Sequence, residues 1–465
     1  MDSVTAVMSS QILFGLNFHE PEVNTRLFAP YGDQGASMFL MLKMLGAGRP
    51  VAQESYSFFE KGRIHETFIV RANVADPGAG NDILISLAAL SVDASNRFYP
   101  QLGDDILFAN EVVGRVELVN IANPAIPVLT VSPKEVTDNI GALTAGDEVV
   151  IYSNSFGEGS AMPGGRVTKP TEYSNNLKII KSVFAGTGTE MTNKAWAKIY
   201  DETGKTFLGW YNHQLDVDLS YRHNLAISSA LLVDKIVTNT AKVIDALSQA
   251  GSNVAQGTDG LITLVKQRGI PVPVASGAFT LASLYSLSLE LDKQFAGDDY
   301  MLLSGNKRAQ NIEQALKTVL NDTGVDYSKN VAVKELLAGQ SNAEAKSVSL
   351  AFSDLFASNR WWHLKTMPEF KNPAVLGADG FPYADMTIGV PMGKTKDAKT
   401  GELSSYCGYR YKELGGNNRF MQTWTDGAGG PTAKVGPVDI KYDYVMSHLG
   451  FEGACMNKFF RIYAP

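Results

Sequence analysis

The segment Gly389–Thr395, with the sequence Gly-Val-Pro-Met-Gly-Lys-Thr, resembles a phosphate-binding loop. A true phosphate loop reads G-x-x-x-x-G-K-S/T and opens a helix whose first N–H groups face the phosphate. Here Ile388 stands where the first glycine is required, and the residues from Lys396 to Gly401 predict a turn. We therefore expect no nucleotide site at this position.

The histidines lack the spacing of a zinc site. His19-Glu20 and His65-Glu66 have no second histidine four residues further on, as the helical zinc motif requires. His213 and His223 fall in one predicted helix but lie about three turns apart, so we interpret both as packing residues. Asp93-Ala94-Ser95-Asn96 lacks the glycine and the distal glutamate of a calcium loop. No metal ligand is predicted.

Other reactive patterns are equally incomplete. Gly157-Glu158-Gly159-Ser160 is not the G-x-S-x-G elbow of a serine hydrolase. Cys407 and Cys455 have no catalytic signature and cannot form a disulfide framework, so we expect small buried apolar residues in a reducing cytoplasm. Trp361-Trp362-His363 could stack on a base or a sugar, but few basic residues accompany it, and a core or subunit-contact cluster is the favoured interpretation. The sequence predicts no catalytic residue and no cofactor.

The composition is that of a folded protein with a sizeable core. The chain has 465 residues, of which 45% are apolar and 19% charged. The apolar stretch Met38–Leu45 contains Lys43 and is too short to cross a bilayer, and Asp2 stands where a signal peptide carries basic residues. We therefore expect a soluble, unexported chain. A formal charge of −7 disfavours a dedicated nucleic-acid binder, although a protein that merely encloses DNA needs no basic surface.

The elements that would position these residues change in type along the chain. Residues 1–50 predict an arm with one short helix near Ala36–Leu45. Residues 50–170 predict a small β-barrel or sandwich, because short β-prone runs alternate with turns. These runs are Thr67–Val70, Ile83–Leu87, Val116–Val119 and Val149–Tyr152.

The second half predicts helices as well as strands. A stripe of apolar residues four apart predicts a long amphipathic helix between Lys205 and Lys242; its members are Tyr211, Leu215, Leu219, Ala226 and Ala230. Residues 261–425 then alternate between β-prone and helical runs. We expect strands at Asp299–Leu303, Ser347–Phe352 and Asn457–Tyr463, and a helix at Asn311–Leu320.

An ordered series of motifs occupies Gly103–Thr189. Two strand starts, Gly103-Asp104-Asp105-Ile106 and Gly146-Asp147-Glu148-Val149, precede the Glu158-Gly159 segment and then Asn175-Asn176-Leu177-Lys178-Ile179. Looser matches follow at Asp259–Ile262, Tyr409–Tyr411 and Asn418–Phe420. This order resembles the major capsid proteins of tailed bacteriophages with the Hong-Kong-ninety-seven-type fold, in members that carry an inserted β-subdomain. Lys178 stands where that family often has glutamine.

The resemblance implies an α+β fold and a non-enzymatic shell subunit. It assigns residues 1–50 to an N-terminal arm, 51–175 to an extended loop with an inserted β-subdomain and 176–260 to a peripheral domain, with its spine helix at about 208–232. Residues 261–425 would form the axial domain, and 426–465 would return to the peripheral domain. The implied partners are further copies of the chain, as hexamers and pentamers, together with portal and scaffold or decoration proteins. The shell would enclose DNA without sequence-specific binding, contact no membrane, assemble in the host cytoplasm and reside in the virion.

Two alternatives remain open at this point: a β-rich virion decoration or fibre protein, and, less favoured, an enzyme. We further expect the β-rich segment of about 60–160 to have a core of its own and to project from the shell. The terminal run Phe459–Tyr463 should share a domain with the long helix and with the strand near Leu177, because it is apolar on both faces.

Overall fold

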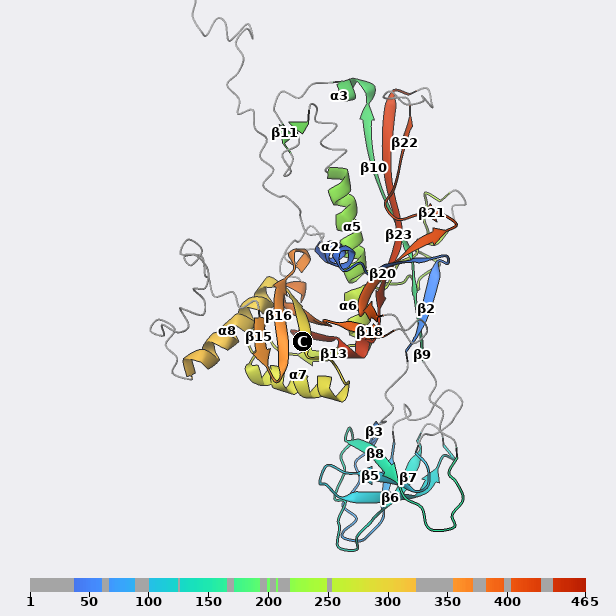
Figure 1. Ribbon diagram of the computed structural model, residues 1–465, viewed down its shortest axis with the longest axis vertical. Coiled ribbons are helices and arrows are strands. Elements are labelled where there is room, and N and C mark those ends of the chain that lie inside the picture. The colour runs from blue at the N-terminus through green and yellow to red at the C-terminus, as the bar shows by residue number, and fades with distance from the viewer. Residues whose placement is uncertain are drawn as a thin grey trace, which may run out of the picture. The chain divides into compact units, whose positions relative to one another are not determined.

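The computed structural model describes residues 37–60, 67–87, 100–123, 126–164, 171–192, 199–200, 206–207, 218–248, 253–322, 354–370, 382–396, 403–427 and 438–465. The chain forms two compact units (Figure 1). One is the continuous segment Phe59–Tyr173, and the other combines Met1–Phe58 with Ser174–Pro465. Helix and sheet are both present, in agreement with the predicted α+β class.

The unit Phe59–Tyr173 is a small antiparallel β-barrel. Its strands follow the order β3-β8-β5-β6-β7-β4, and a bridge between Val70 and Leu87 joins β4 back to β3. Closure of this kind removes exposed sheet edges. The bounds are β3 Thr67–Ile69, β4 Ile83–Ser86, β5 Asp104–Leu107, β6 Val113–Asn120, β7 Val128–Pro133 and β8 Glu148–Asn154. All four β-prone runs predicted between residues 50 and 170 are strands or strand ends of this barrel.

Alternation of side chains fills the barrel. In β4, Ile83 and Ile85 are buried while Leu84 is exposed, as expected for a strand with one face inward. Alternate residues of β7 and of the first halves of β6 and β8 point inward in the same way, and the apolar core of the barrel is drawn only from its own residues. This core comprises Phe68, Val70, Ile83, Ile85, Leu87, Ile106, Phe108, Val116, Leu129, Val131, Ile140, Leu143, Val149 and Ile151.

Two strands begin with the same turn. In Gln101–Asp104 and in Thr144–Asp147 the third residue is a glycine with positive φ, +85° at Gly103 and +103° at Gly146. The aspartate carboxylate then accepts the N–H of the first turn residue, at 2.8 Å from Gln101 and 2.7 Å from Thr144. Hydrogen bonds from the backbone and the hydroxyl of Thr144 also lower the pKa of Asp147. The two Gly-Asp motifs of the sequence are therefore one structural device used twice.

The second unit contains a long antiparallel ribbon. Its central strand β23 (Ile440–Gly453) pairs with β10 (Lys178–Thr187) on one edge. On the other edge β23 pairs first with β22 (Gln422–Gly427) and then with β20 (Cys407–Leu414). The strand β1 (Gly48–Val51) extends the sheet beyond β20, and β21 (Asn417–Asn418) pairs with β20. The strands β2 (Ser55–Glu60) and β9 (Thr171–Asn176) pair with each other where the chain leaves this unit and returns to it.

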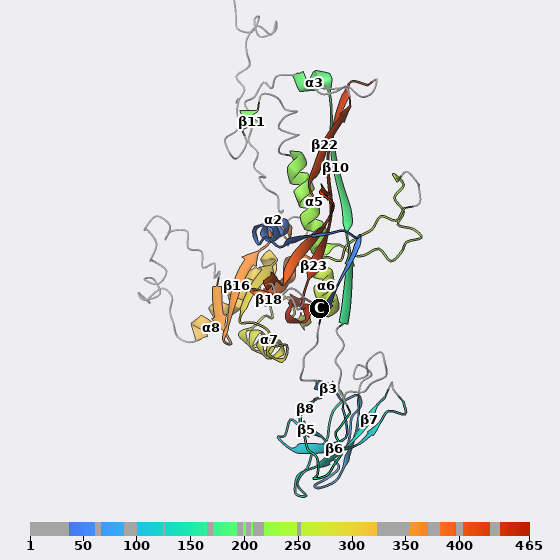
Figure 2. The ribbon, with the colours of Figure 1, turned by 45° about the vertical axis from the view of Figure 1, so that its right-hand side comes forward.

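The helix α5 (Leu219–Val233) covers one face of this ribbon, and Figures 1 and 2 both show it running beside β10. It is shorter than the predicted helix: residues 206–207 belong to the strand β12 (Thr206–Phe207), and Asp234 is already extended. The helix ends because residues 257–260 pack against its last turn, where the hydroxyl of Thr263 and the N–H of Gly260 donate to the carbonyl of Asp234 at 2.9 and 3.0 Å. Tyr211 and Leu215 lie outside the described residues.

The buried stripe of α5 also differs from the predicted one. Ala226 is exposed, whereas His223 and Ile227 are fully buried between Leu219 and Leu231. The pattern is therefore i, i+4, i+8 and i+12, with a histidine in an otherwise apolar row. His223 was not part of the predicted stripe because histidine is polar, although its spacing from Leu219 fits the stripe.

A mixed sheet forms the rest of the unit, in the order β13-β24-β17-β14-β16-β15. The predicted strand Asp299–Leu303 and helix Asn311–Leu320 are confirmed as β14 (Asp299–Ser304) and α8 (Asn306–Asp322), and the predicted helix at Ala36–Leu45 is α2 (Ser37–Met44). The remaining bounds are β13 Ile270–Pro273, β15 Asp354–Ala357, β16 Arg360–Thr366, β17 Met386–Pro391, β18 Lys394–Lys396, β19 Leu403–Ser405, β24 Phe460–Tyr463, α3 Gly188–Thr192, β11 Ile199–Tyr200, α6 Leu261–Arg268, α7 Leu281–Lys293, η4 Pro368–Phe370, η5 Pro382–Asp385 and η6 Met456–Lys458. The predicted strand Ser347–Phe352 lies outside the described residues.

The terminal strand β24 belongs to the mixed sheet. It pairs with β13 and β17 of the mixed sheet, and not with β10, the strand that begins beside Leu177. Consecutive strand residues point to opposite faces, so Phe460 and Ile462 fill the core beneath α7 while Phe459 joins the apolar cluster that contains Ile227 and Leu231 of α5. The run is therefore buried on both faces, as predicted, and it takes part in two apolar clusters.

Candidate functional site

The phosphate-loop candidate is part of a β-hairpin. Gly389 lies inside β17, and a Cβ built on it would lie 2.0 Å from the ring of Phe460. After Gly393 the chain continues as β18, which pairs with β19, so no helix N-terminus faces a ligand here. The predicted turn at residues 397–401 lies outside the described residues. This glycine is present because an aromatic ring packs directly on the backbone.

The aromatic run at Trp361–His363 divides between core and surface. Trp362 is buried, stacks on Tyr300 at 5.4 Å between ring centroids and donates from its indole nitrogen to the carbonyl of Ala357. Trp361 is exposed on the opposite face and stacks on His363 at 6.4 Å. The core interpretation therefore holds for Trp362.

The remaining chemical candidates are occupied by local structure. Ser160 donates from its hydroxyl to the carbonyl of Gly157 at 2.7 Å within a turn. Cys407 is buried, which raises the pKa of its thiol to about 12, while Cys455 is half-buried; both are free thiols. The motifs His19-Glu20, His65-Glu66, Asp93–Asn96 and His213 lie outside the described residues. Within the part of the chain that the structure describes, no group of three or more potential metal ligands gathers.

His223 is the chemical candidate that the fold places most firmly. Its ring nitrogens lie 2.9 Å from the hydroxyl of Ser182 on β10 and 2.8 Å from that of Ser447 on β23. Burial lowers the pKa of this imidazole to about 4, so it is neutral near pH 7. It is a packing histidine with both nitrogens engaged, which is the interpretation that the sequence favoured.

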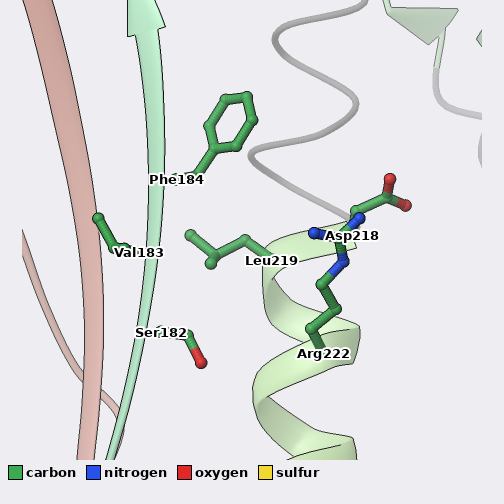
Figure 3. Close-up of a pocket in the computed structure, with 6 residues that line it drawn as sticks. All are labelled: Ser182, Val183, Phe184, Asp218, Leu219 and Arg222. Carbon is green, nitrogen blue, oxygen red and sulfur yellow. The ribbon is translucent and has the colours of Figure 1, made fainter. Parts of the chain in front are cut away.

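A cavity of about 240 Å³ opens beside this histidine (Figure 3). It lies between β10 and the start of α5, and Figure 3 shows Ser182 and Phe184 pointing toward the helix while Val183 points away. Leu219, Asp218 and Arg222 complete its lining. Three apolar and three polar side chains around so small a space do not assemble a nucleophile, a base and an oxyanion donor.

The face of the ribbon away from α5 carries exposed apolar and aromatic side chains in the part of the chain that the structure describes. Val183 pairs with Tyr444, and Tyr444 pairs with Trp424, so the three side chains form one row across β10, β23 and β22. Tyr444 stacks on Trp424 at 5.2 Å and on Tyr442 at 6.0 Å. Val183 is 57% exposed and Trp424 43% exposed. We name this set, with the exposed Ile179, the outer ribbon face.

The sequence did not reveal the outer ribbon face. Its strands come from residues 178–187, 422–427 and 440–453, and only long-range pairing brings Val183 beside Tyr444. The alternation within β10 (exposed Ile179, Val183; half-buried Ser182, Phe184) was the one local signal.

A buried carboxylate docks the arm helix onto the same unit. Glu369 is fully buried, and its Oε1 accepts the N–H of Met38 in α2 at 2.9 Å and the hydroxyl of Ser228 in α5 at 2.7 Å. The carboxylate thus satisfies an N–H at the start of α2 that has no partner within the helix. Glu369 thus links α2, which precedes the barrel in the sequence, to α5 and η4, which follow the barrel.

No protein-family model and no curated protein matches the sequence, but solved structures match the fold. A structure from Microbacterium phage Oxtober96 is 8% identical, with 99% of this chain and 100% of the other covered and a TM-score of 0.40. The capsid of a native GTA particle is 8% identical, covers 99% of each chain and gives a TM-score of 0.39. The capsid of cyanophage P-SCSP1u is 12% identical, with 68% and 81% covered and a TM-score of 0.33. The chain is similar to phage capsid structures.

The motif series of the sequence falls at defined places in the fold. Its two Gly-Asp turns start β5 and β8, its Asn175–Ile179 segment joins β9 to β10, and Tyr409–Tyr411 lies in β20. Asn175 links its own segment to β23 and to the residues before α6, because its amide donates to the carbonyls of Asp259 and Phe451 at 3.0 and 2.7 Å. Among the described residues, no helix is long and apolar enough to cross a membrane.

Proposed function

We propose that this chain is the major capsid protein of a tailed bacteriophage, a structural subunit that assembles with copies of itself into an icosahedral shell around the genome. It has no catalytic residue, cofactor or metal in this proposal. Hexamers and pentamers of the chain are its main contacts, with portal and scaffold or decoration proteins as further partners. The shell assembles in the host cytoplasm and resides in the virion.

The outer ribbon face carries the proposal. Contiguous apolar side chains mark contact surfaces. Here exposed Val183 and Trp424 lie on either side of Tyr444, and exposed Tyr442 stacks on Tyr444. The helix α5 supports this ribbon from behind. Aromatic residues on a rigid strand lose little conformational entropy on binding, which favours them in interfaces. A shell subunit needs such contact faces.

The domain assignment belongs to this proposal. The barrel would be the inserted subdomain of the extended loop, α5 the spine helix of the peripheral domain and the mixed sheet the axial domain. The segment Phe59–Tyr173 contains 15 acidic and 8 basic residues, a net charge of −7, while the rest of the chain has 33 of each. Because DNA repels such a charge, this distribution favours a barrel that projects from the shell on the side away from the genome.

A paired substitution tests the subunit contact. Val183→Thr with Trp424→Thr removes the apolar row and keeps residues that favour strands. We expect this double variant to fold but to remain as unassembled subunits in light scattering. Leu84→Thr, at an equally exposed strand position of the barrel (61%), is the matched control and should assemble like the wild type. Normal shells from the double variant would exclude the outer ribbon face as a contact.

A decoration or fibre protein is not favoured, since the β-rich barrel is the smaller of the two units and the larger one contains α5, α6, α7 and α8.

A further inference from the structure

His223 connects three elements at one buried point. It projects from α5, and its two ring nitrogens meet hydroxyls on two neighbouring strands, Ser182 of β10 and Ser447 of β23. The side chain is completely shielded from solvent. The contact is therefore a three-way junction between the helix and two strands of the ribbon. An apolar side chain at position 223 could form neither of the two hydrogen bonds.

The hydrogen bonds at the junction define one tautomer of the neutral ring. The hydroxyl oxygen of Ser447 accepts the N–H of Met421 at 3.1 Å and lies 3.6 Å from the sulfur of Met421, to which its proton is directed. This oxygen accepts the proton on Nε2, and the hydroxyl of Ser182 donates to the bare Nδ1. A second ring proton would meet the Ser182 proton head-on and force that hydroxyl to turn away.

Among the described residues, the acidic side chains near the junction are engaged elsewhere or lie at the cavity. On the same side of β23, Asp443 is held by Lys441 at 3.0 Å and by the hydroxyl of Thr425 at 2.9 Å. Lys178 of β10 is bound to Asp234 beyond the far end of α5, at 2.9 Å. Asp218 and Arg222 of α5 line the cavity, and burial is the cause that lowers the pKa of His223.

The cavity reaches one hydrogen-bond partner of the ring. Ser182, the partner of Nδ1, is one of its lining residues, and Arg222 precedes His223 in the chain. Figure 3 shows the Ser182 side chain on the helix-facing side of β10. The space is large enough for water molecules, so the Ser182 hydroxyl has an alternative partner once Nδ1 is protonated.

We propose that His223 is an acid-sensitive clamp, which fastens α5 to β10 and β23 while the ring is neutral and releases the helix from the ribbon when the ring is protonated. The inference stands on the junction and the cavity and does not require the capsid assignment. The folded-state pKa lies below the ordinary value of about 6.5, so the clamp is complete above pH 6.5. Its stabilisation is lost as the pH falls from 6.5 toward 4.

Amide hydrogen exchange of the purified full-length chain at pH values from 8 to 4, corrected for intrinsic rates, tests the clamp. We expect protection of the 219–233 and 178–187 segments to fall at least tenfold between pH 6.5 and 4.5, while barrel segments change little. His223→Gln retains hydrogen bonding but cannot titrate, so the same segments should show a flat pH profile. An unchanged acid response in His223→Gln would overturn the proposal.

If the His223→Gln variant does not fold, exchange of the histidine C2–H protons in the wild type tests the clamp. The peptide that contains His223 should report a pKa well below 6.5, and loss of α5 protection should follow that titration. A pKa near 6.5, or α5 protection that is insensitive to the titration, would contradict the clamp. His448, whose pKa burial also lowers to about 4, is resolved in a separate peptide and serves as the internal reference.

Discussion

Gly103 and Gly146 show why individual residues in the motif series are glycine. Each is the third residue of a turn with positive φ, a conformation that costs other residues about 1–2 kcal/mol. Their surroundings differ: a Cβ at Gly146 meets no atom within 4 Å, whereas one at Gly103 would lie 2.7 Å from the ring of Phe156. At Gly146 only the backbone conformation requires glycine. At Gly103 both the backbone conformation and the packing of Phe156 require it.

We therefore predict that Gly146→Ala lowers the free energy of unfolding of the barrel by about 1–2 kcal/mol, and that Gly103→Ala lowers it further. Chemical denaturation followed by barrel-specific hydrogen exchange measures both. Gly157→Ala, at a glycine with ordinary φ and nothing within 4 Å, is the control and should change stability by less than about 0.5 kcal/mol. Equal costs at Gly157 and Gly146 would show that the positive φ is not the cause.

At the scale of elements, the terminal strand stabilises the larger unit from inside. Phe459 and Phe460 are fully buried on opposite faces, in separate apolar clusters. Tyr300, Trp362 and Phe460 pack ring against ring, with Phe460 centroids 5.6 and 5.9 Å from those of Tyr300 and Trp362. A short strand at the end of the chain thus fills both sides of the sheet that it joins.

Truncation of the Phe460 side chain should lower the free energy of unfolding. We predict that Phe460→Ala destabilises the chain by about 3–5 kcal/mol, because the cavity adds to the lost transfer energy, and that deletion of residues 457–465 yields insoluble or unassembled protein. Phe295→Ala, at a 68% exposed phenylalanine, is the matched control and should be nearly neutral. Thermal unfolding measures the point variants, and sedimentation tests the deletion. Shells of normal size from the truncated chain would refute this role.

Local sequence patterns predicted individual strands and helices. They did not predict the features that depend on contacts between residues far apart in the sequence. The barrel strands were predictable because Ile83 and Ile85 alternate with polar or exposed neighbours, and α8 because its apolar residues repeat with the helical period. The end of α5 was not, since it depends on Gly257, Gly260 and Thr263 packing against it from another segment. The pairing of Val183 with Tyr444 joins residues 261 positions apart, so the outer ribbon face is invisible to any local pattern.

At the scale of the whole molecule, the two units are built independently. The barrel core contains residues 68–151 only, and no strand of the barrel pairs with the mixed sheet in the described residues. Its 115 residues, Phe59–Tyr173, are within the usual size of a domain that folds alone. The net negative charge of the chain also arises in this segment.

We predict that the segment Phe59–Tyr173, produced by itself, folds into a monomeric barrel with cooperative thermal unfolding and dispersed amide NMR signals. The closed sheet with its own core is the physical reason, because neither needs a side chain from the larger unit. A collapsed spectrum without cooperative unfolding would mean that the barrel depends on the rest of the chain.

The central claim is that the chain builds a closed shell, and negative-stain electron microscopy of the purified full-length protein tests it most directly. The account predicts closed icosahedral particles or, below the assembly threshold, hexameric and pentameric capsomers, with size-exclusion elution near the void volume for the particles. A fibre or decoration protein would stop at a trimer and show rods or small discrete particles. A uniform population of monomers or trimers, unchanged as the protein concentration is raised, would contradict the account.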